Sequence, residues 1–168
     1  MKLKRIAAGI TAVMFCAGML SVMPYGGVQT YAAEAVYNNF EVDYEGWHGT
    51  NYDVVMNAVN GAGYDGSRGM TVSGRLAAED GATSSKGFYL FGDVEYTYSM
   101  KVYSAEDETF HLNLLCIDDA TGEETVVELD SAAVKGGEWT ELSAVYTAPK
   151  DSYEFRLTLT TDSTNDFS

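Results

Sequence analysis

The chain has 168 residues, and its 10 Lys and Arg residues are outnumbered by 25 Asp and Glu residues, which gives a formal net charge of −15 at pH 7. A surface this acidic repels phosphate groups, so the composition excludes nucleic acid and anionic lipid as partners. Only two histidines and two cysteines are present, which leaves few residues for zinc or thiol chemistry.

The first 32 residues have the features of a secretory signal. MKLKR is positively charged, IAAGITAVMFCAGMLSVMP is apolar, and TYAA provides small residues for cleavage. A single membrane anchor is the alternative, but glycines and Pro24 interrupt the apolar run. We therefore predict that residues 1–32 are removed, that residues 33–168 form one secreted, extracellular domain, and that this domain does not associate with membranes. Cleavage leaves Cys116 as its one thiol, so no intrachain disulfide is expected.

Beyond the signal, the chain alternates apolar and polar residues with the two-residue period of β-strands. The pattern is clearest in EYTYSMKVYS, TFHLNLLCI, TVVEL, WTELSAVYTAP and SYEFRLTLTT, and DDATGEE between the second and third is typical of a hairpin turn. No window shows the apolar stripe of a helix. The sequence therefore predicts an all-β fold of two antiparallel sheets packed as a sandwich.

Catalytic motifs are missing from the sequence. There is no HExxH, no GxSxG and no glycine-rich phosphate loop. Cys116 falls on the apolar side of its predicted strand, where a small buried side chain is expected. The pattern favours a binding module over an enzyme.

The order of short motifs resembles a known family. YNNFE, GW, YDGSRGMTVSGR, VEYTYSMKVYS, GGEWTELSAVYTAP and TTDSTNDF, spread over residues 37–167, are similar to the family 22 carbohydrate-binding modules and their neighbours in families 4 and 9. The resemblance implies a jelly-roll β-sandwich that binds a plant cell-wall polysaccharide, such as xylan or pectin, without cleaving it. It also implies a monomeric module that directs an attached, secreted hydrolase or lyase to its substrate. Trp47 and Trp139 stand where the family buries a tryptophan, so the resemblance implies that both lie in the core.

The stretch SGRLAAEDG departs from that family. Xylan-binding relatives carry an Arg followed by Trp-Asn-Gly, and the Trp stacks on a xylose ring; here Arg75 leads to Glu79, Asp80 and Gly81. Carboxylates thus replace the aromatic platform, and they could bind sugar hydroxyls, bind calcium or form a solvated loop. Two alternative functions remain open: a small hydrolase or lyase that uses Arg75, Glu79 and Asp80, and a structural or adhesion module.

Three further residues complete the predicted carbohydrate site. His111 and Asn113 point to the polar side of one strand, and Tyr103 is expected on the same side of a neighbouring strand. Amide, imidazole and phenol groups in one patch suit sugar hydroxyls and ring faces. We expect this patch to act together with the loop that carries Arg75.

The resemblance also implies a structural calcium ion as cofactor. Relatives hold it with the Phe-Glu of the first strand and the turn before the next strand, and Glu41, Asp65 and Ser67 match these positions. The remaining ligand of the relatives comes from a further strand, whereas this sequence ends at Ser168. We therefore expect the domain to be truncated at its C-terminus, with its last strand missing and one strand edge open.

Overall fold

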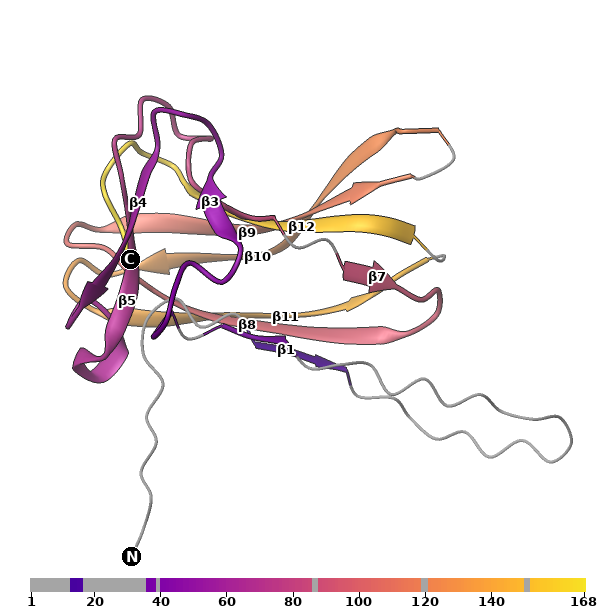
Figure 1. Cartoon of the computed structure of the whole chain (residues 1–168), viewed down its shortest axis with the longest axis horizontal. Helices are drawn as coiled ribbons and strands as arrows, with labels where there is room; N and C mark the ends of the chain where they lie inside the picture. Colours follow the sequence, from indigo (N-terminus) through magenta and orange to yellow (C-terminus); the bar gives the residue numbers. More distant parts are fainter. Residues whose placement is uncertain (1–12, 17–35, 39, 86–87, 119–120, 150–151) are drawn as a thin grey trace, which may run out of the picture.

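The computed structural model describes residues 13–16, 36–38, 40–85, 88–118, 121–149 and 152–168. These residues form two antiparallel sheets stacked face to face, with a small two-stranded sheet at one end (Figure 1). The predicted all-β sandwich is confirmed. The described part of the chain contains no helix with the length and hydropathy needed to cross a bilayer.

The six-stranded sheet contains the strand that carries His111 and Asn113. Its order is β10 (Glu124–Val134), β9 (Glu108–Ile117), β12 (Ser152–Thr161), β6 (Ala82–Ser84) and β3 (Trp47–Gly49), with β7 (Phe88–Leu90) also paired to β12. A β-bulge interrupts the register of β10 between Glu128 and Asp130. β12 thus has a neighbour on each side, as its continuous alternation requires.

The four-stranded sheet forms the opposite layer. Its order is β11 (Trp139–Thr147), β8 (Glu95–Tyr103), β1 (Val13–Cys16) and β2 (Val36–Tyr37). β1 pairs with β8 from Ser99 to Tyr96, so it covers the strand edge that lies away from β11. β1 falls within the predicted signal segment, the rest of which lies outside the described residues, and removal of that segment stays a prediction.

The two-stranded sheet joins the two layers at one end. It consists of β4 (Val55–Asn60) and β5 (Arg68–Ser73), connected through the 3₁₀ turn η1 (Tyr64–Gly66). The end of the chain crosses between this sheet and β8: Phe167 forms β-bridges with Val72 and Ser104, and Ser168 exchanges two backbone hydrogen bonds with Tyr103. The buried ring of Phe167 packs edge-on against Phe110, so the last residues are part of the core.

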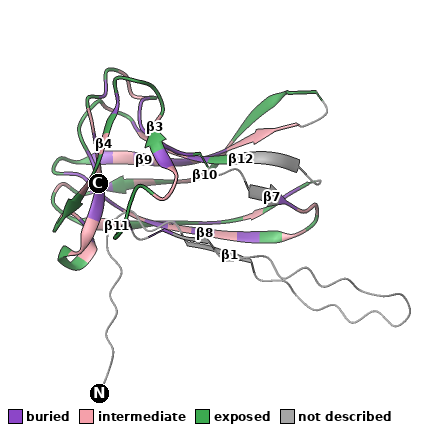
Figure 2. Ribbon diagram, viewed as in Figure 1, coloured by how far each residue is buried: buried purple, intermediate pink, exposed green. Residues whose placement is uncertain are grey.

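The core lies between the two large sheets. Buried and partly exposed residues alternate along β8 and β9, which is visible on β8 in Figure 2. Trp47 is in the core as predicted, and its indole nitrogen donates to Asn38 at 3.2 Å. Trp139 is only half-buried, because it begins β11 opposite Tyr103 and shares that residue's outward direction. Cys116 is half-buried, and desolvation raises the pKa of its thiol.

Candidate functional site

A row of polar side chains crosses the outer face of the six-stranded sheet. Strand register places five residues side by side on it, one from each strand in turn: Glu128, Asn113, Thr158, Thr83 and His48. Asn113 and Thr158 alternate with core residues such as Leu112 and Leu159, so they point away from the core, and Glu128 and His48 are exposed. Thr83 is itself buried, and its hydroxyl donates to the carbonyl of Leu157 at 3.2 Å. We call these five residues and His111 the polar face.

His111 lies two residues before Asn113 on the same side of β9, and two carboxylates hold its ring. Its Nε2 atom is 2.9 Å from Asp162 and its Nδ1 atom is 3.3 Å from Glu128. Desolvation, the largest effect, lowers the pKa of His111, but hydrogen bonding and attraction to Asp162 and Glu128 outweigh it and raise the pKa. The prediction that His111 and Asn113 share an outward face is confirmed.

Tyr103 does not belong to the polar face. The sequence analysis expected its strand to neighbour that of His111 and Asn113, but β8 pairs with β11 and β1 in the opposite sheet. The short connection between β8 and β9 crosses from one layer to the other instead of forming a hairpin. Tyr103 and His111 therefore point to opposite sides of the molecule, and this part of the predicted patch is wrong.

Arg75 is buried in the loop that precedes β6, and its guanidinium donates four hydrogen bonds there. Nε donates to the carbonyl of Asp80 at 2.6 Å, and Nη2 donates to that of Ala78 at 2.9 Å. Nη1 donates to the Thr161 hydroxyl and the Asn165 carbonyl, both at 2.7 Å. The guanidinium carbon also lies 4.9 Å from the ring centroid of Phe167. Arg75 therefore ties its loop to the end of the chain.

Asp80 is likewise turned inward. One carboxylate oxygen accepts the backbone N–H groups of Leu76 and Ala77, each at 2.9 Å, and the other accepts the side-chain amide of Asn51. The hydrogen bond from Leu76, the largest effect, and those from Ala77 and Asn51 lower the pKa of Asp80. Glu79 is exposed. Of the three predicted residues in this loop, Glu79 is thus the one with its side chain at the surface.

Tyr52 is a candidate that the sequence analysis missed. It is fully exposed on the loop between β3 and β4, and it lines a hollow of about 580 Å³ together with His48, Thr50 and Asn51. The hollow therefore begins at the His48 end of the polar face. In the sequence, Tyr52 stands in the stretch HGTNYDVV between two strands. A single aromatic residue in such a position can be either buried or exposed, so the sequence alone did not identify it as a candidate.

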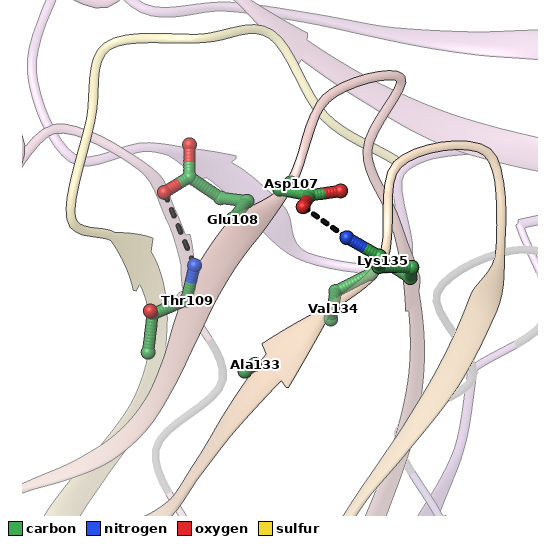
Figure 3. Close-up of a pocket in the computed structure, with 6 residues that line it drawn as sticks. All are labelled: Asp107, Glu108, Thr109, Ala133, Val134 and Lys135. Atoms are coloured by element: carbon green, nitrogen blue, oxygen red, sulfur yellow. Dashed lines mark hydrogen bonds and ion pairs between the residues drawn. The ribbon is translucent and has the colours of Figure 1, made fainter.

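A second hollow lies at the ends of β9 and β10. It has a volume of about 380 Å³ and is lined by Asp107, Glu108, Thr109, Ala133, Val134 and Lys135 (Figure 3). Asp107 reaches across to Lys135, whereas Glu108 turns the other way and accepts the backbone N–H of Thr109. The other oxygen of Glu108 accepts the hydroxyl of Ser163, so this buried carboxylate is used to hold the chain end.

The residues predicted to bind calcium surround an arginine. Glu41 accepts the backbone N–H of Arg68, and the Arg68 guanidinium donates to the carbonyls of Glu41 at 3.0 Å and Val42 at 3.3 Å. Asp65 is exposed, and the Ser67 hydroxyl contacts the carbonyl of Tyr64 at 3.4 Å. Within the described residues, no three acidic, His or Cys side chains gather closely enough to hold a metal ion. Arg68 thus brings a positive charge to carbonyl oxygens in this region, and calcium stays a prediction.

In Figure 1, the connection between β3 and β4 and the β9–β10 hairpin rise above the same side of the six-stranded sheet. The polar face combines amide, hydroxyl, imidazole and carboxylate groups, and the exposed phenol ring of Tyr52 lines the hollow beside it. Within the described residues this face carries no paired nucleophile and base. This arrangement suits the binding of a ligand rich in hydroxyl groups. An enzyme site would also need groups that activate the bound ligand for reaction.

Comparisons with known proteins identify the family. A model described as a carbohydrate binding domain matches residues 33–165. Endo-1,4-beta-xylanase Y of Acetivibrio thermocellus is 45% identical over 170 residues, which is 99% of this chain and 16% of that protein. The chain thus spans less than a fifth of that xylanase.

Solved structures of related proteins support the same family. The N-terminal CBM22-1–GH10 modules of a Clostridium thermocellum xylanase, solved with xylohexaose, align at 46% identity and a TM-score of 0.71, covering 76% of this chain and 25% of that one. The CBM22-2 xylan-binding domain of Paenibacillus barcinonensis Xyn10C has the same fold at 16% identity, with a TM-score of 0.65 over 76% of this chain and 90% of that domain. The chain therefore belongs to the family of carbohydrate binding domains, and it is a binding module rather than an enzyme.

Proposed function

We propose that this domain binds a neutral plant cell-wall polysaccharide of the xylan type on its polar face and directs an attached enzyme to that substrate. The observation that carries the proposal is the row from Glu128 to His48, which continues into the hollow beside Tyr52. Strands lie about 4.8 Å apart, so the five-strand row extends about 19 Å. A row of this length accommodates several sugar residues.

Each part of the face has a role in this proposal. The Asn113 amide and the Thr158 hydroxyl exchange hydrogen bonds with sugar hydroxyls, and Tyr52 stacks on a ring face at the end of the row. Glu79 accepts a further hydroxyl from its exposed position. Arg75 and Asp80 act as positioning residues, because their hydrogen bonds shape the loop next to Asn51 and Tyr52.

Charge favours a neutral chain over pectin. The carboxylates of Glu128 and Asp162 are more than half exposed, and Glu79 and Asp53 are exposed nearby. The net charge of −15 adds a negative field around the site. A polyuronate such as the pectin backbone is repelled by this field, whereas a xylan backbone is not.

The targeting role rests on the relatives. The similar proteins are xylanases, and in the Clostridium thermocellum structure the matched module accompanies a GH10 module. Attachment to a bound polysaccharide keeps an enzyme at a high effective concentration near its substrate. In this proposal the domain is a monomeric module of a larger extracellular enzyme, and the predicted signal in residues 1–32 supports its secretion.

Affinity electrophoresis tests the proposal. The full chain is run through gels that contain xylan, mixed-linkage glucan, mannan or polygalacturonate. We expect retardation by xylan and none by polygalacturonate. Tyr52→Ala should weaken xylan binding by about 1–3 kcal/mol, by analogy with the loss when a nucleobase loses its aromatic stacking partner.

Tyr44→Ala is the matched control, because Tyr44 is also exposed but does not line the hollow. Asn113→Ala tests the centre of the row. If Tyr52→Ala and Asn113→Ala bind xylan as tightly as the unmodified chain, the polar face is not the binding site. Strong retardation by polygalacturonate would contradict the neutral ligand.

A further inference from the structure

The opposite side of the sandwich carries an aromatic cluster that the polar face does not involve. Tyr103 and Trp139 are cross-strand neighbours on β8 and β11, with ring centroids 5.4 Å apart and planes tilted by 40°. Tyr64, from η1, meets Trp139 edge-on at 5.9 Å. We call Tyr64, Tyr103 and Trp139 the aromatic surface.

All three rings remain partly accessible to solvent. Tyr64, Tyr103 and Trp139 are half-buried, whereas the inward-facing neighbours Val102 and Leu142 are almost completely buried. Aromatic rings that served only as core would be covered, since each contributes most to stability when its whole surface leaves water. The three half-covered rings instead form an apolar patch on an otherwise polar sheet face.

Polar groups with balanced charge adjoin the rings. One step along the strands, Lys101 and Glu141 are opposite each other and form an ion pair at 3.1 Å. The Lys101 ammonium also lies 4.5 Å from the ring centroid of Tyr64, and Ser99 donates to the other Glu141 oxygen at 2.8 Å. On a chain with a net charge of −15, this patch combines one cation with one anion.

We propose that the aromatic surface is a second carbohydrate-binding site, which takes a neutral sugar chain on the four-stranded sheet. The C–H face of a pyranose packs against Trp139 and Tyr103, while Lys101 and Glu141 donate to and accept from adjacent hydroxyls. The site is independent of the polar face, because the two lie on opposite sides of the sandwich. One module then contacts two polysaccharide chains, or two segments of one bent chain.

The two tryptophans make this proposal directly measurable. Trp47 is buried and hydrogen-bonded to Asn38, whereas Trp139 is half-exposed on the aromatic surface. Quenching of tryptophan fluorescence by the neutral quencher acrylamide therefore reports chiefly on Trp139. The full chain is titrated with xylohexaose, cellohexaose and mannohexaose, and Trp139→Phe assigns the signal to the correct indole.

We expect a neutral hexasaccharide to protect Trp139 from acrylamide, and this protection to persist in Tyr52→Ala, which alters only the hollow beside the polar face. Tyr64→Ala keeps Trp139 as the reporter. It should weaken the affinity for the protecting hexasaccharide by about tenfold. Lys101→Met should weaken it as well, because a hydroxyl loses its charged donor.

Two results overturn the proposal. The first is the absence of protection by all three hexasaccharides, which leaves the cluster as a structural feature or a contact for another protein. The second is protection that disappears in Tyr52→Ala, which means that one site on the polar face produces the signal. Weaker xylan retardation in Tyr52→Ala with protection of Trp139 retained separates the two sites.

Discussion

The imidazole of His111 lies 2.9 Å from the carboxylate of Asp162, and these residues are 51 positions apart in the chain. Glu128 approaches the other ring nitrogen at 3.3 Å. An imidazole with a carboxylate at each nitrogen is best satisfied when both nitrogens carry protons, so the charged form is favoured. His111 thus joins three strand regions of the polar face through a group whose pKa these carboxylates raise.

This pairing predicts a pH-dependent stability. The pKa of His111 is raised in the folded protein, so its contribution is complete below the unfolded value of about 6.5 and is lost as the pH rises through the raised folded pKa. We expect the difference in melting temperature between the unmodified chain and His111→Gln to be larger at pH 6 than at pH 9. Thermal melts across this range provide the measurement. His48→Gln is the matched control, and an equal pH trend in both variants would rule out the His111 pairing as the cause.

Arg75 should matter for stability more than its position in a loop suggests. Its guanidinium makes four hydrogen bonds and contacts Phe167, so its removal leaves buried carbonyls without donors. We expect Arg75→Ala to lower the free energy of unfolding in urea by about 3 kcal/mol. Arg75→Lys should recover little of it, because one ammonium cannot reach partners on several sides.

Glu79→Ala, in the same loop, is the control and should leave stability unchanged. The comparison also separates two roles for Arg75. If Arg75→Ala remains as stable as the unmodified chain but loses xylan retardation, Arg75 contacts the ligand directly, and its role as a positioning residue is wrong.

Gly81 is required for the loop to pass close to β12. A Cβ atom at this position would lie 2.0 Å from the carbonyl oxygen of Leu159, and the Gly81 backbone already exchanges hydrogen bonds with Thr50. Gly81→Ala should therefore cost about 2 kcal/mol or more and loosen the connection to Tyr52. Gly122→Ala, at a turn where the added Cβ meets no atom but φ is +71°, should cost about 1 kcal/mol. Equal losses in urea unfolding would contradict the close approach.

Arg68 leads to a prediction about calcium. Its guanidinium already binds the carbonyls of Glu41 and Val42 and, through Nε, that of Ala58 at 3.3 Å. We therefore expect calcium to change the melting temperature of the unmodified chain little. In Arg68→Ala these carbonyl oxygens lose their cation, so calcium should raise the melting temperature of the variant more than that of the unmodified chain. Melts with calcium and with chelator test this, and a strong calcium effect on the unmodified chain would instead support ligation by Glu41, Asp65 and Ser67.

The sequence by itself determined the strands and the direction of their side chains. The period of two in β8, β9 and β12 follows from local covalent geometry, which sends successive side chains to opposite faces whatever the strand pairs with. For the same reason the outward direction of His111 and Asn113 could be predicted from a short stretch, whereas the burial of Trp47 was implied by the family resemblance. The order of motifs added the family, and with it the sandwich.

Only the tertiary structure decided which side chains share a surface. Alternation does not say whether two consecutive strands form a hairpin or cross between layers, and that choice separated Tyr103 from His111 and joined it to Trp139. The partners of Arg75 include Thr161 and Asn165, 86 and 90 positions away, so its burial had no local signature. Tyr52 became a candidate in the same way, because exposure is a property of everything that packs around a residue, and a sequence window contains only its chain neighbours.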